Sequence, residues 1–99
     1  MSVTGRRSAD GRELVIEAPE RFDFTVHAEF REAYRDVQGP VQYIVDLART
    51  EYMDSSALGM LLLLREHAGD GSRVRIINLQ PDVRQIMDTA NLGRLLAIE

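Results

Sequence analysis

Apolar residues along the chain fall into short runs typical of buried strands and longer stretches with helical spacing. Residues 41–47 form a run rich in β-branched and aromatic side chains, and residues 73–79 form a second one. Such runs are typical of strands that are covered on both faces. Between them, Asp54-Ser55-Ser56 opens a stretch to about Ala68 that is apolar nearly all round and stops at Gly69. The pattern predicts a buried helix between two strands.

The first part of the chain predicts a hairpin. Asp10-Gly11 is a two-residue turn signal, and it would join a weak strand near Val3–Arg7 to a better one over Glu13–Ala18. Pro19 ends the second strand, because proline has no backbone N–H to donate to a neighbouring strand.

Two more helices are predicted on either side of this central unit. Apolar residues recur at helical spacing from Val26 to Val37, with Thr25 as the expected N-cap and Gly39-Pro40 as the stop. Pro81 suits the first position of the last helix. The chain then closes on apolar residues that we expect to form a short edge strand, namely Leu92, Leu95, Leu96 and Ile98.

The order strand, helix, strand, helix predicts a βαβα unit, because parallel strands need a crossover connection and the helix after Ser56 supplies one. The hairpin adds antiparallel pairing. We therefore predict an α/β fold with a mixed four- to five-stranded sheet and helices mainly on one face. A length of 99 residues suits one domain, which we assign to residues 1–99.

Composition narrows the chemistry. The chain has neither cysteine nor lysine, which excludes thiolate nucleophiles, thiolate metal sites, Schiff bases and a P-loop lysine. The net charge is −4 and the arginines are scattered among acids, which argues against a nucleic-acid surface. No apolar run marks a signal peptide, and Ala57–Leu64 is far shorter than the roughly 20 residues of a membrane span. We expect a cytoplasmic protein with no membrane partner.

The Asp54-Ser55-Ser56 turn is the strongest candidate for a site. It lies between a buried strand and a helix, where ligands and modifications usually lie in open α/β sheets. The free N–H groups and the positive dipole end of a helix start can accept a phosphate without a basic side chain. Asp and Ser are also the commonest N-caps, so a purely structural role is the simpler alternative. The two roles are compatible.

At this point the sequence resembles the STAS domain family and, within it, the bacterial anti-sigma factor antagonists. The similarity covers essentially the whole chain, and its most specific element is Asp-Ser-Ser-x-Leu-Gly after a buried strand. It is carried by Val45-Asp46-Leu47, the segment Tyr52 to Gly59, Arg73 to Leu79, Pro81 to Arg84, and Ala90-Asn91-Leu92.

The resemblance implies a phosphorylation-switched protein-binding module and not an enzyme. Ser55 maps to the phosphoacceptor, with Ser56 as the fallback, and Asp23 maps to an acidic residue of the partner surface. The implied partners are an anti-sigma factor that doubles as the serine kinase and a phosphatase of the PP2C type. The chain itself needs no cofactor, because ATP and Mg²⁺ belong to the kinase. The expected partner-binding residues are Asp23, Asp54, Ser55, Ser56, Leu58, Gly59 and, if its helix face is exposed, Met60.

Three alternatives use the same residues differently. A STAS subunit of a lipid-trafficking ABC transporter would share the fold and dock on a nucleotide-binding domain. A phosphoaspartate receiver would use Asp46 or Asp54, but that family also uses a lysine. A serine hydrolase lacks support, because no Gly-x-Ser-x-Gly motif is present. His27 and His67 are isolated histidines without a second ligand at metal spacing.

Overall fold

The computed structural model describes residues 3–69 and 73–99. The elements in chain order are β1 (Thr4–Arg7), β2 (Glu13–Glu17), β3 (Arg21–Phe22), the 3-10 helix η1 (Phe24–Val26), α1 (His27–Tyr34), β4 (Gln42–Asp46), β5 (Tyr52–Met53), α2 (Ser55–Ala68), β6 (Val74–Ile77), α3 (Pro81–Thr89), the 3-10 helix η3 (Leu92–Arg94) and β7 (Ala97–Ile98).

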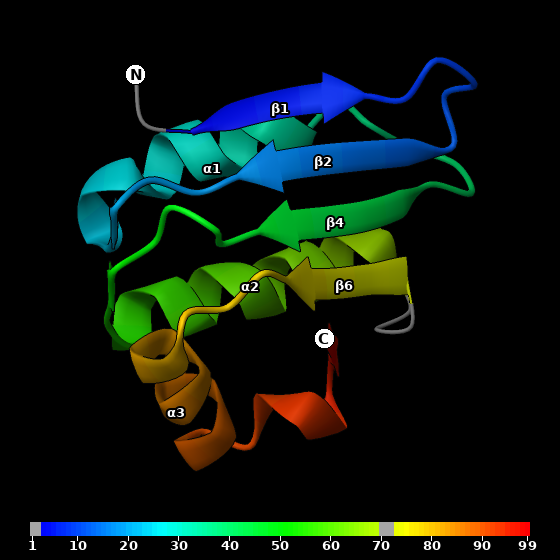
Figure 1. The fold of residues 1–99 in the computed structure, drawn as a ribbon. Helices are drawn as coiled ribbons and strands as arrows, with labels where there is room; N and C mark the ends of the chain where they lie inside the picture. Colours follow the sequence, from blue (N-terminus) through cyan, green and yellow to red (C-terminus); the bar gives the residue numbers. More distant parts are fainter. Residues whose placement is uncertain (1–2, 70–72) are drawn as a thin grey trace.

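The main sheet has five strands in the order β1-β2-β4-β6-β7. The β1–β2 pair is antiparallel and the other pairs are parallel, so the sheet is mixed as predicted. In Figure 1, α1 and α2 lie side by side behind the sheet, while α3 lies beyond its β6 side. The predicted mixed α/β fold with helices mainly on one face is confirmed.

The core lies between the sheet and the two helices. Alternate strand residues point into it in register, and α2 adds Ala57, Leu61 and Leu64, which are all 0% exposed. On the opposite face of β4, Ile44 is 7% exposed, whereas Gln42 is exposed. The predicted burial of this strand on both faces is therefore found only at its centre. The buried strand residues are Leu14, Ile16, Tyr43, Val45, Val74 and Ile76.

The hairpin and the first helix differ from their predicted limits. The β1–β2 connection is longer than two residues, because the last pair is Arg7 with Leu14 and Gly11 takes a left-handed φ of 74° within the loop. The first helix ends at Tyr34 and not near Val37.

The central helix starts and stops where the sequence predicts. Asp54 caps α2, and Gly69 ends it with a left-handed φ of 82°, while its N–H donates to the Arg65 and Glu66 carbonyls. Pro81 occupies the first turn of α3. The predicted edge strand is shorter than expected: β7 beside β6 includes Ile98, whereas Leu92 lies in η3, and Leu95 and Leu96 lie between the two elements. Within the described residues, no helix is long and apolar enough to cross a membrane.

Candidate functional site

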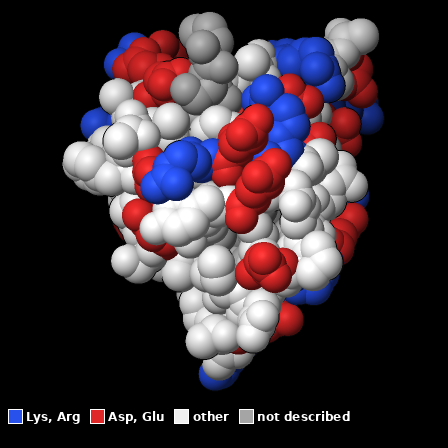
Figure 2. All heavy atoms as spheres, turned by 60° about the vertical axis from the view of Figure 1, so that its left-hand side comes forward, with Lys and Arg blue, Asp and Glu red and all other residues white. Residues whose placement is uncertain are grey.

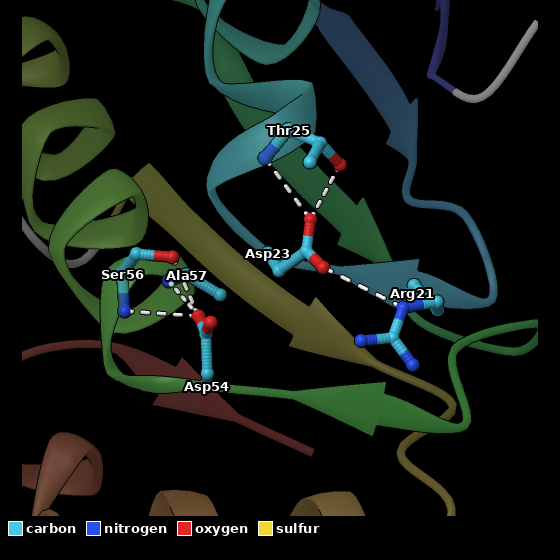
Figure 3. A network of polar contacts seen from close by, with 6 residues as sticks. All are labelled: Arg21, Asp23, Thr25, Asp54, Ser56 and Ala57. Carbon is cyan, nitrogen blue, oxygen red and sulfur yellow. Dashed lines mark hydrogen bonds and ion pairs between the residues drawn. The ribbon is translucent and has the colours of Figure 1, made fainter.

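A second, two-stranded sheet aligns two helix starts. In β3 and β5, Arg21 pairs with Tyr52 and Phe22 with Met53, and the two strands are parallel. Asp23 and Asp54 are therefore the next residues of both strands, and each begins a helix, η1 or α2. Figure 3 shows both carboxylates with the contacts that they make at these helix starts. The sheet thus brings together two acids that lie 31 positions apart in the sequence.

Polar contacts between the loops that precede β3 and β5 hold this small sheet in place. The Thr50 side chain is fully buried, and its hydroxyl donates to the Pro19 carbonyl at 2.9 Å. The Glu20 carbonyl accepts hydrogen bonds from the N–H groups of Glu51 and Tyr52 at 2.9 and 3.0 Å. The Arg21 guanidinium lies 4.4 Å above the centre of the Tyr52 ring. These contacts fix the spacing of the two aspartates.

The two aspartates make matching hydrogen bonds. Asp54 Oδ1 accepts from Ser56 N at 3.0 Å and from Ser56 Oγ at 2.5 Å. Asp23 Oδ1 accepts from Thr25 N at 3.0 Å and from Thr25 Oγ1 at 2.5 Å. The prediction that Thr25 is an N-cap is therefore wrong, because Asp23 has that role and Thr25 is its donor. The Thr25 hydroxyl is the largest cause that lowers the pKa of Asp23, and Arg21, at 3.5 Å, adds to it.

The two serines differ in accessibility. The Ser55 side chain is exposed, and its hydroxyl has no hydrogen-bond partner within the part of the chain that the structure describes. Ser56 is half-buried, and its hydroxyl is held by Asp54. Ser55 is thus open to a modifying enzyme, while Ser56 is oriented by a carboxylate.

A shallow apolar groove of about 460 Å³ lies beside the serine turn, between the start of α2 and α3. Asp54 and Ser55 line it from the α2 side, and Asp82 lines it from α3. Its apolar lining consists of Met53, Leu58, Ile86 and Ala90.

The side of the molecule that carries these helix starts is rich in acids. Figure 2 shows Asp and Glu side chains close together on it, with arginines near them and uncharged surface around. Glu20 and Glu51 are exposed and joined through the backbone hydrogen bond described above. A further negative charge placed here meets like charges.

Comparison with known proteins identifies the family. Residues 6–97 match the family model described as "Mlab, STAS domain". A STAS-domain containing protein of Pseudomonas aeruginosa (strain UCBPP-PA14) is 48% identical over 100 residues, which covers 99% of each chain. The chain therefore belongs to the STAS domain family.

Solved structures share the STAS fold at low sequence identity. An anti-sigma factor antagonist (STAS) domain protein from Planctomyces limnophilus superposes with a TM-score of 0.82 at 17% identity, over 99% of this chain and 89% of that one. The anti-sigma factor antagonist SpoIIAA, in its unphosphorylated form, gives a TM-score of 0.72 at 18% identity, over 99% and 87%. These likenesses establish the fold.

The structure brings most of the predicted partner-binding residues of this STAS domain to one surface. Ser55 and Gly59 are exposed, and Asp54, Ser56 and Leu58 are half-buried. The prediction for Met60 is wrong, because its side chain is 3% exposed and packs in the core. Among the described residues, no group of three or more His, Cys, Asp or Glu side chains is arranged to hold a metal ion.

Two exposed aromatic residues lie on this surface that the sequence did not assign to the site. Phe24 follows Asp23 and is 67% exposed, with its ring stacked 5.3 Å from that of His27. Tyr52 precedes Met53 and is 43% exposed. Exposed aromatic rings beside a polar site are typical of protein-binding surfaces. The signal in the sequence is the triplet Phe22-Asp23-Phe24, in which only one of the two rings can point into the core.

Proposed function

We propose that this STAS domain is a cytoplasmic anti-sigma factor antagonist and not an enzyme. Its unmodified form binds and sequesters an anti-sigma factor that is also a serine kinase. Phosphorylation of Ser55 releases that partner, and a PP2C-type phosphatase restores binding. Two solved proteins with this fold are described as antagonists, one of them in its unphosphorylated form, which supports the proposal.

The observation that carries the proposal is the exposed Ser55 hydroxyl at the first position of α2, which has no hydrogen-bond partner among the described residues. A kinase needs such a hydroxyl to be accessible. Asp54 already accepts hydrogen bonds from the Ser56 and Ala57 N–H groups, and the positive dipole end of this 14-residue helix still favours an added anion there. The chain can thus carry the phosphate without refolding.

The same phosphate opposes docking. It adds about −1.5 to −2 charges to a surface that already holds Asp23, Asp54, Glu20 and Glu51. Burying these like charges against a partner costs several kcal/mol, since charged groups must lose water without gaining a counter-charge. A loss of about 1.4 kcal/mol already weakens binding tenfold.

The choice between the two serines rests on geometry. Ser55 is preferred because it is exposed, while Ser56 must first release its hydrogen bond to Asp54. Ser56 is the second candidate for phosphorylation. Its hydroxyl donates to the Asp54 carboxylate, and an adjacent carboxylate can activate a hydroxyl as a nucleophile.

Intact-mass measurement tests the modification. The purified chain is incubated with ATP, Mg²⁺ and the serine kinase encoded nearest its gene, and phosphopeptides are then mapped. We expect one added phosphate on Ser55, its loss in Ser55→Ala, and no loss in Ser56→Ala. Modification at Ser56 alone would move the switch by one residue, and no modification of the turn would refute the switch.

Titration calorimetry with the same kinase tests the docking surface. We expect Ser55→Ala to bind like the unmodified chain and Ser55→Asp to bind at least tenfold more weakly. Phe24→Ala should weaken binding similarly, because exposed aromatic anchors dominate such interfaces, whereas Leu95→Ala, which trims a side chain of 40% exposure elsewhere, should not. Equal affinity of Ser55→Ala and Ser55→Asp would contradict the proposal. Binding to a transporter's nucleotide-binding domain instead, unaffected by either change, would favour the transporter alternative.

A further inference from the structure

A second pocket opens between α1 and α2, away from the serine turn. It has a volume of about 380 Å³. His27, Arg31, Tyr34 and Arg35 recur at helical spacing, and these four residues line the pocket from one face of α1 and its C-terminal end. Leu63 and His67 line it from α2. All of its titratable side chains are Arg, His or Tyr, in a chain whose net charge is −4.

The two arginines of this pocket differ in their partners. Arg35 donates to Glu32 at 2.6 Å and lies 3.5 Å from Asp36, so its charge is already neutralised. The Arg31 side chain forms no hydrogen bond or ion pair within residues 3–69 and 73–99. Its guanidinium therefore has its full set of donors available to an anion that enters the pocket.

Tyr34 supplies a second donor. Its side chain is only 6% exposed, and its ring packs edge-on against Phe30 and His67, with centroids 5.9 and 4.9 Å apart. The hydroxyl has no hydrogen-bond partner among the described residues. Among the described residues, every polar side-chain atom that is closed off from solvent has a hydrogen-bond partner. Because the Tyr34 hydroxyl has none, it must be accessible to solvent, and the access is through the pockets that Tyr34 lines.

The hydroxyl stays protonated and able to donate. Burial is the larger effect and raises the pKa of Tyr34, while the charge of Arg31 acts in the opposite direction. Arg31 and Tyr34 line the same pocket, which places both donors around one cavity. His67 is fixed beside it, because its Nε2–H donates to the Val37 carbonyl at 2.6 Å.

We propose that this pocket binds a small oxyanion, with the Arg31 guanidinium as the charged donor and the Tyr34 hydroxyl as the neutral one. Both carboxylate and phosphate present oxygen acceptors of this kind, and a guanidinium binds either in a two-pronged arrangement. Leu63, which is 49% exposed, forms an apolar rim that favours an anion with a short apolar tail.

This proposal does not depend on the proposed switch. His67 lies 12 residues after Ser55 on the same helix, which corresponds to roughly 18 Å along the axis. A ligand at this end of the pocket therefore leaves the serine turn uncovered. His27, at the other end, stacks on Phe24, so the two sites are separated by testing Ser55 variants against the partner and Arg31 variants against the anion.

Nuclear magnetic resonance titration of the full chain tests the pocket. Inorganic phosphate and acetate are added separately, and sodium chloride at matched ionic strength serves as the blank. We expect saturable shifts of the Arg31 side-chain N–H and the aromatic signals of Tyr34 and His67 with at least one of the two anions. The arm that saturates at lower concentration identifies the ligand class as phosphate or carboxylate.

Variants assign the donors. Arg31→Gln should weaken binding about tenfold or more, the effect of losing a charged hydrogen bond. Tyr34→Phe removes only the hydroxyl and should weaken it several-fold. Arg94→Gln, which removes the same charge from exposed η3, should leave it unchanged. Shifts that rise linearly and match sodium chloride, or that survive Arg31→Gln, would overturn the site.

Discussion

Gly59 offers a test in which stability and binding should change in opposite directions. It is the fifth residue of α2, on the exposed side of the helix. A Cβ placed on it would meet no atom within 4 Å, and its φ is not left-handed. Glycine in a helix interior costs about 0.8–1.0 kcal/mol relative to alanine, because its unfolded chain has more freedom to lose. Gly59→Ala should therefore raise the free energy of unfolding by up to about 1 kcal/mol.

For a domain of this size, 1 kcal/mol corresponds to a rise in Tm of roughly 4–8 °C. Thermal unfolding followed by circular dichroism, together with urea titration, measures both quantities. Gly39→Ala is the matched control, because Gly39 also has open space around it but adopts a φ of 92°, which alanine disfavours. That variant should lose stability. A Gly59→Ala variant that melts at or below the parent temperature would show that the start of α2 is not the regular, solvent-exposed helix described above.

The same methyl group should hinder docking. Gly59 lies one helical turn after Ser55, so its missing side chain leaves room for a partner to approach the backbone. We expect Gly59→Ala to bind the proposed kinase partner more weakly although it is more stable. Loss of fold cannot produce that combination. Unchanged affinity would place Gly59 outside the interface and restrict contact to the serine turn and Phe24.

Three further predictions concern the polar framework of the site. Thr50→Val should lower the free energy of unfolding by about 1–3 kcal/mol in urea titration, because the Pro19 carbonyl loses its buried donor. Asp54→Ala should cost about 0.5–2 kcal/mol by the same assay through loss of the α2 cap, while Asp54→Asn keeps most of it. Asp23→Asn should change the pH dependence of Tm. The folded pKa of Asp23 is lowered from 3.8, so its contribution is present above that value and is lost as the pH falls through the folded pKa.

The outcomes that contradict these predictions are specific. A Thr50→Val variant as stable as the parent would mean that water replaces the lost donor. An Asp54→Asn variant as unstable as Asp54→Ala would assign the effect to charge and not to capping. For Asp23, the stability difference between parent and Asn variant should shrink as the pH falls below about 3.8. A difference that stays constant down to acid pH would show that the Thr25 contacts do not stabilise the carboxylate.

Local patterns predicted the parts of the fold that depend on neighbouring residues. The α2 helix has its cap at Asp54 and its stop at Gly69 within one contiguous pattern, so both ends followed from the sequence. The burial of Met60 did not follow from the sequence. The α2 helix is apolar on several sides, and only packing against the sheet and α1 decides which face is buried.

The small sheet of β3 and β5 shows the limit of sequence reasoning most clearly. Each strand has two residues, too few for any periodic signal. Their pairing depends on contacts across 31 positions, including the buried bond from Thr50 to Pro19. Asp23 could be assigned to the site only through the family resemblance, and the structure supplies the physical reason, which is the register of this pair.

The two aligned helix starts, at Asp23 and Asp54, also show that an N-cap aspartate by itself does not determine what a helix start can bind or carry. Asp23 and Asp54 bind the hydroxyl and N–H two residues later with the same distances, so these hydrogen bonds cannot distinguish the two turns. The residue between differs, and it is Phe24 in one turn and Ser55 in the other. One turn therefore presents an exposed ring that gains from leaving water, and the other presents a hydroxyl that can be esterified. In the proposed switch, a phosphate on Ser55 would have to lose water for the partner to cover Phe24, and that coupling would let the phosphate control binding.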